Sequence, residues 1–198
     1  MAVTIAESSS PADWIFESDS PWTRLVTFGP GGFGAYARLR FLPDPEFHGQ
    51  MIRDAAPSDY RHRGEQEGRL MAELCAVLAD ATSTPERCYF AVWSGYHGVT
   101  QCISGTRTFR VPNRQYQLYS GSVADAQSWA DAPATGPTIF LNPPAMVWPA
   151  DHAWFIACDT DSHWAGIGAD VPVIARLVER ADLDIMNASP WDTQPMYR

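Results

Sequence analysis

The sequence predicts an α+β fold with a mostly antiparallel sheet and a few helices packed against it. Short segments with strand-like apolar patterns follow one another closely and are separated by Gly- and Pro-rich turns. The three- and four-residue apolar spacing of an amphipathic helix is strongest in residues 64–81 and 170–181. No strand–helix–strand unit of a parallel sheet is visible, so we do not expect a doubly wound fold.

The length of 198 residues suits one domain with a well-buried core. We therefore expect a single domain over residues 1–198, with ragged ends at about 1–10 and 187–198.

The N-terminal part is expected to begin with a short helix over Pro11–Glu17, because Ser10 and Pro11 resemble a helix start. A strand over Trp22–Phe28, a glycine-rich turn and a strand over Ala35–Leu42 would then form a hairpin. In the second strand apolar residues alternate with arginines, the two-residue period of a half-buried strand. Residues 43–62 are expected to form a long loop.

Apolar spacing and turn residues predict the remaining elements. The main amphipathic helix is expected over Gly64–Ala81. A capping box at Ser122 and Asp125 begins a short helix, and Asp170 caps a later helix that has a proline in its first turn. Strands are predicted at Cys88–Trp93, Arg107–Val111, Gln115–Ser120, Thr138–Leu141, Ala153–Asp159, Ala165–Gly168 and, at a sheet edge, Asp182–Met186.

The charged residues exclude several functions. A net charge of −9 repels phosphate groups, so no nucleic-acid partner is expected, whereas a basic protein partner would be attracted. All 14 cationic residues are arginines. Without lysine there is no Schiff-base chemistry, no phosphate-binding lysine of a P-loop and no strand lysine of a protein kinase.

The sequence contains no apolar run long enough to cross a membrane and no secretory leader. Its four cysteines, at 75, 88, 102 and 158, form no CxxC pair. We therefore expect a cytoplasmic protein with reduced thiols and no membrane partner. No cofactor is predicted, and the oligomeric state is left open.

The densest group of polar side chains lies at Asp159, Asp161 and His163. If the preceding strand continued, alternate residues would point one way and offer two carboxylates and an imidazole to Mn, Fe or Zn, or to proton transfer. His97, in a flexible loop, is a further catalytic candidate. The alternative interpretation is a hairpin turn in which the carboxylates cap backbone groups.

Two other features have a structural and a functional interpretation. The segment Gly29–Gly34 fits GxGxxG, but a dinucleotide fingerprint requires a helix after the loop, and the residues that follow alternate like a strand. A hairpin turn is therefore favoured over phosphate binding. Trp148, Trp154 and Trp164 are candidates for lining a ligand pocket, although each also suits a core position.

The segment VWPADHAWFIACDTDSHWAGIGAD, with RQYQLYSGSV and the residues around Gly29–Gly34, resembles a family of uncharacterised proteins from high-GC bacteria. The shared pattern is WPxDxxWxxxxDxDxxxxGxG followed by a helix. The resemblance covers most of the chain and implies a cytoplasmic single-domain protein without a known activity. The matching positions are Trp148, Pro149, Asp151, Trp154, Asp159, Asp161, Gly166 and Gly168.

Three functional hypotheses follow. We favour an acidic binding or interaction module, of an inhibitor-like kind that neutralises a basic partner, because the chain is acidic, rich in aromatics and without a complete catalytic motif. The opposing hypothesis is a small metal-dependent or acid/base enzyme that uses Asp159, Asp161 and His163. The third is a protein that binds a small apolar ligand between tryptophans.

Overall fold

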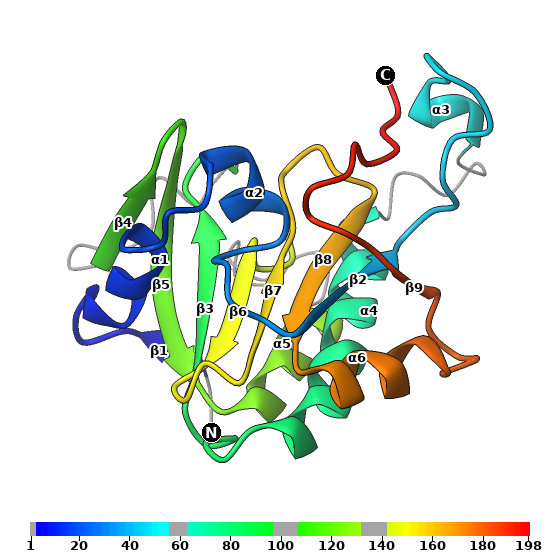
Figure 1. Cartoon of the computed structure of the whole chain (residues 1–198). Coiled ribbons are helices and arrows are strands. Elements are labelled where there is room, and N and C mark those ends of the chain that lie inside the picture. Colours follow the sequence, from blue (N-terminus) through cyan, green and yellow to red (C-terminus); the bar gives the residue numbers. More distant parts are fainter. Residues whose placement is uncertain (1–2, 56–62, 97–106, 132–141) are drawn as a thin grey trace.

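One antiparallel sheet organises the described part of the chain, which comprises residues 3–55, 63–96, 107–131 and 142–198 of the computed structural model (Figure 1). Among these residues the sheet has nine strands in the order β1-β5-β3-β6-β7-β8-β2-β9, with β4 also paired to β5. This architecture confirms the predicted α+β class. The strands are β1 (Thr4–Ile5), β2 (Ala35–Arg40), β3 (Cys88–Trp93), β4 (Arg107–Val111), β5 (Arg114–Gly121), β6 (Met146–Pro149), β7 (Trp154–Ala157), β8 (Trp164–Ala169) and β9 (Ile185–Asn187).

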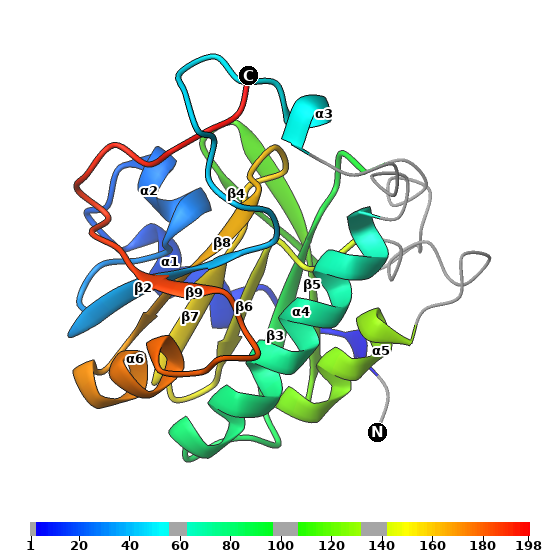
Figure 2. The same cartoon turned by 90° about the vertical axis from the view of Figure 1, so that its right-hand side faces the viewer.

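Helices cover both faces of this sheet. Figure 2 shows α4, α5 and α6 on one side of the strands and the short helices α1 and α2 on the other. The helices are η1 (Ser10–Ala12), α1 (Asp13–Phe16), α2 (Trp22–Thr27), α3 (Ile52–Ala55), α4 (Arg63–Leu78), η3 (Ala79–Ala81), η4 (Val123–Ala126), α5 (Gln127–Ala130) and α6 (Val171–Val178). Among the described residues, no helix combines the length and the apolar character that crossing a bilayer requires.

The central strands contribute to two separate hydrophobic cores. Phe90 of β3 and Ile156 of β7 pack with α4 and α6, whereas their neighbours Ala91 and Phe155 pack with α1 and α2. Because successive side chains in a strand point to opposite faces, a strand that is covered on both sides has no polar face. This explains why β3 and β7 have almost continuous apolar sequences.

Most predicted elements are confirmed, and two strands, β3 and β4, have the predicted bounds. The prediction of a strand over Trp22–Phe28 is wrong, because these residues form the helix α2. The predicted loop 43–62 contains the one-turn helix α3. The predicted strand Thr138–Leu141 lies outside the described residues.

Two strands were not predicted at all. Thr4–Ile5 pairs with β5, and Met146–Pro149 lies between β3 and β7. The C-terminal residues also contact the rest of the chain, since the Tyr197 hydroxyl donates a hydrogen bond of 2.7 Å to the carbonyl of Pro43.

Candidate functional site

The predicted cluster at Asp159, Asp161 and His163 lies at the turn between β7 and β8, where its members point to different partners. Asp159 accepts two hydrogen bonds from Arg114 of β5, at 3.0 Å from Nε and 3.2 Å from Nη2. The hydrogen bond to Asp159 raises the pKa of Arg114. Asp161 is exposed to solvent.

His163 belongs to a partly buried ion-pair network that we call the Asp44 cluster: Arg38, Asp44 and His163. Arg40 also lies 3.4 Å from the Asp44 carboxylate. Asp44 accepts hydrogen bonds from both terminal nitrogens of Arg38, at 2.9 and 3.0 Å, and lies 3.1 Å from Nε2 of His163. Burial alone would raise the pKa of Asp44, but the hydrogen bonds from Arg38 and His163 outweigh it and lower the pKa. The cluster joins Arg38 of β2 to Asp44 in the loop after β2 and to His163, the residue before β8.

These contacts give little support to a reaction centre at Asp159, Asp161 and His163. Within the described ranges, no group of three or more His, Cys, Asp or Glu side chains is arranged to hold a metal ion. His97, the fourth catalytic candidate, lies outside the described residues.

The three candidate tryptophans are core residues. Trp148, Trp154 and Trp164 are each at most 2% exposed, and none lines either of the cavities described below. Trp154 donates a hydrogen bond from its indole nitrogen to the carbonyl of Leu78, at 3.0 Å.

The glycine-rich segment connects a helix to a strand, so the predicted hairpin turn is wrong. Helix α2 ends at Thr27 with Phe28 as its C-cap, and Gly29 follows with a left-handed φ of +82°, the conformation that glycine commonly supplies just after a helix. A methyl group on Gly29 would lie only 2.2 Å from Cδ1 of Phe155. The loop therefore packs directly on the sheet. The helix precedes the loop, which is the reverse of the dinucleotide-binding arrangement.

Helix α2 itself lies very close to the sheet because β8 has a glycine below it. A Cβ atom at Gly166 would be 2.1 Å from the carbonyl oxygen of Thr27, the last residue of α2. Any side chain at this position would push the helix away. Gly166 thus fixes the position of α2 and of the arginine that it carries, Arg24.

A cavity of about 620 Å³ opens beside α2 and the glycine-rich loop, and we call it the Arg24 pocket. Its volume is within the usual range for small-molecule sites. It is built by the N-terminal helices, the loop, β2 and the C-terminal segment. It is lined by Trp14, Glu17, Ser18, Asp19, Ser20, Arg24, Pro30, Gly31, Gly32, Phe33, Tyr36 and Trp191.

Arg24 is unusual because its charge is buried without an opposite charge among the described residues. The residue is 7% exposed, and among the described residues its guanidinium donates one hydrogen bond, from Nη2 to the Tyr36 hydroxyl at 2.9 Å. Its Nε is buried and has no hydrogen-bond partner within the described ranges. Nor does a carboxylate in this part of the chain form an ion pair with it. A buried charge without a counter-charge is costly, and a bound anion would remove that cost.

Other groups in the Arg24 pocket suit an anion at the same place. A Cβ atom on Gly31 would lie 3.7 Å from Nη2 of Arg24, so the loop backbone passes close to the guanidinium. The backbone N–H groups of Gly32 and Phe33 donate no hydrogen bond to other described residues. The exposed ring of Trp191 lies 4.2 Å from the Arg24 guanidinium carbon. Gly32 and Phe33 line the same cavity as Arg24, and successive backbone N–H groups without a partner in the fold can bind an anion.

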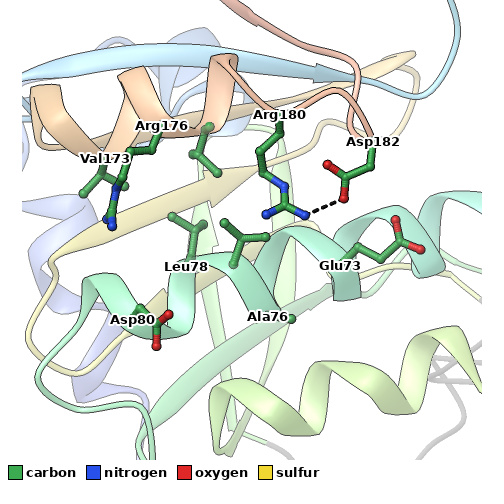
Figure 3. Close-up of a pocket in the computed structure, with 10 residues that line it drawn as sticks. Glu73, Ala76, Leu78, Asp80, Val173, Arg176, Arg180 and Asp182 are labelled. Atoms are coloured by element: carbon green, nitrogen blue, oxygen red, sulfur yellow. Dashed lines mark hydrogen bonds and ion pairs between the residues drawn. The ribbon is translucent and has the colours of Figure 1, made fainter.

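A second cavity, of about 540 Å³, is a groove between α4 and α6 on the opposite face of the sheet (Figure 3). Its arginines differ from Arg24. Arg176 and Arg180 are exposed to solvent, and Arg180 forms an ion pair with Asp182. Because water stabilises both charges and Asp182 also stabilises that of Arg180, neither arginine requires a ligand.

The sequence did not identify Arg24 as a site residue. Gly29 was the available signal, because glycine commonly follows the last residue of a helix. A helix that ends before Gly29 would have placed Arg24 on that helix, next to the glycine-rich loop. Comparison of the whole chain with protein families, curated proteins and solved structures found no match. The resemblance to uncharacterised proteins of high-GC bacteria stays a prediction.

Proposed function

We propose that this protein is a binding module that takes a small anionic ligand in the Arg24 pocket. The observation that carries the proposal is the guanidinium of Arg24, buried at the pocket without a carboxylate partner among the described residues. Guanidinium groups bind carboxylates and phosphates through strong, charge-assisted hydrogen bonds. An anion on Arg24 would supply the missing opposite charge.

The composition of the pocket favours binding over catalysis. Its lining, as far as the described residues show it, includes neither histidine, the commonest general base, nor cysteine, the strongest side-chain nucleophile. This agrees with the preference for a binding module over an enzyme that the sequence alone suggested.

A basic protein partner is a second proposal, and the net charge of −9 supports it. It predicts complexes whose affinity falls steeply between low and moderate salt, as charge screening requires. A ligand in the Arg24 pocket and a basic partner elsewhere on the surface are compatible.

The primary proposal is tested by titrating acetate into 15N-labelled protein and following amide and indole signals by NMR. Two charge-assisted hydrogen bonds of about 2 kcal/mol each correspond to a Kd on the order of 1 mM. We expect saturable shifts at Gly31, Gly32, Phe33 and the Trp191 indole.

Arg24→Gln should abolish these shifts. Arg176→Gln, which removes the same charge from the α4–α6 groove, should leave them unchanged. Acetate shifts that are absent in the wild type, or that persist in Arg24→Gln, would refute the proposal.

A further inference from the structure

We infer that the ligand of the Arg24 pocket is a small zwitterion, whose anionic group lies on Arg24 and whose cationic group faces Glu17 and Asp19. The inference rests on the proposed function and adds the chemical class of the ligand. It follows from the distribution of charge and of aromatic rings around the pocket.

The pocket wall has two carboxylates as well as its one guanidinium. Glu17 and Asp19 both line the cavity and are both exposed, whereas Arg24 is buried. Neither carboxylate forms an ion pair with Arg24 in the described structure. The cavity therefore contains one positive and two negative side chains that do not form ion pairs with each other. Each charge is left to interact with a ligand.

This separation selects against ligands that are only negative. A phosphate or a dicarboxylate would gain from Arg24 but would be repelled by Glu17 and Asp19. A ligand with a cationic group close to its carboxylate would be attracted by both sets of charges. The interactions are partly screened at the exposed carboxylates, so their effect on specificity is expected to be moderate.

A tryptophan also favours a cation in this pocket. Trp14 lines the cavity together with Glu17, and its indole stacks on the His152 ring, 4.0 Å away and nearly parallel. Indole rings attract cations, so Trp14 would add to the attraction of the carboxylates. Trp191 lies over the Arg24 guanidinium and belongs to the anionic end of the site.

Three small probes separate the two charges: propionate carries only the carboxylate, ethylammonium only the ammonium group, and alanine both. Binding of each is measured by NMR titration with the wild type, Arg24→Gln and the double variant Glu17→Gln/Asp19→Asn. The double variant Glu73→Gln/Asp80→Asn is the matched control, because it removes two exposed carboxylates from the α4–α6 groove instead.

We expect alanine to bind the wild type about tenfold more tightly than propionate, and ethylammonium to bind most weakly. In Glu17→Gln/Asp19→Asn, alanine and propionate should bind within about twofold of each other, whereas the control variant should keep the tenfold ratio. Arg24→Gln should bind neither.

Two failures are distinguishable. If propionate binds the wild type as tightly as alanine, or if the ratio survives in Glu17→Gln/Asp19→Asn, the zwitterion inference is wrong while Arg24-dependent anion binding stands. If no carboxylate binds in an Arg24-dependent manner, the proposed function itself is wrong.

Discussion

Two arginines of this protein are almost equally buried but differ in what surrounds their charges. Arg38, 4% exposed, donates two hydrogen bonds to Asp44, which also contacts His163. Arg24, 7% exposed, has a tyrosine hydroxyl as its hydrogen-bond partner and no carboxylate among the described residues. The first charge is compensated within the fold, whereas the second has no counter-charge among the described residues. This difference is the reason that we propose a ligand at Arg24 and none at Arg38.

The largest effect that would sharpen this comparison is expected from Arg38→Met. It removes the buried cation that donates two hydrogen bonds to Asp44 and leaves only Arg40, 3.4 Å from the same carboxylate. Breaking the Arg38–Asp44 pair should lower the free energy of unfolding by about 3 kcal/mol. Urea denaturation measures the change. Arg180→Met is the control, since its exposed ion pair with Asp182 should contribute less than about 1 kcal/mol. Equal effects of the two substitutions would show that the Asp44 cluster is not a structural element.

A smaller loss is expected from Gly166→Ala, which tests how α2 is placed. The new methyl group would meet the Thr27 carbonyl, and overpacking of this kind costs about 2 kcal/mol. Because α2 carries Arg24, acetate binding should weaken as well. Gly34→Ala is the control: its nearest contacts would be 3.3 Å to Cγ2 and 3.4 Å to the backbone nitrogen of Val171, against 2.1 Å at Gly166. Normal acetate binding by Gly166→Ala would show that α2 does not position Arg24.

The smallest of these effects concerns acid stability. The pKa of Asp44 is lowered below its ordinary 3.8 in the folded protein, chiefly because the hydrogen bonds from Arg38 and His163 outweigh its burial. Its contribution to stability is therefore complete above pH 3.8 and is lost as the pH falls through the lower, folded-state pKa. The stability difference between wild type and Asp44→Asn should shrink as the pH falls below 3.8. A difference that stays constant down to pH 2, or grows, would contradict this assignment.

Much of the fold could be predicted from local patterns. β3 and α4 have apolar residues at spacings that suit a covered strand and an amphipathic helix, and both are found as expected. Helix α2 was missed because it is only six residues long and contains Thr and Val, which favour strands. β6 was missed because Pro149 ends it and prolines precede it, a composition more typical of loops.

The candidate site could not be predicted in the same way. All 14 cationic residues are arginines, and the sequence does not show which of them has a carboxylate nearby in the fold. Asp44 reaches Arg38 across six positions, whereas Trp191 reaches Arg24 from the C-terminal segment. Likewise, the spacing of Asp159 and His163 suggested a shared site, but partners from β5 and from the loop after β2 separate them.

The most direct test of the central claim compares the free energy of unfolding of wild type and Arg24→Met, with and without saturating alanine. Without ligand, we expect Arg24→Met to be as stable as the wild type or more stable, because a buried charge that lacks a counter-charge is replaced by an apolar side chain. With ligand, the wild type should become the more stable protein, because only its folded state binds. If Arg24→Met is clearly less stable without ligand, and alanine stabilises neither protein, then Arg24 serves the fold and the account is wrong.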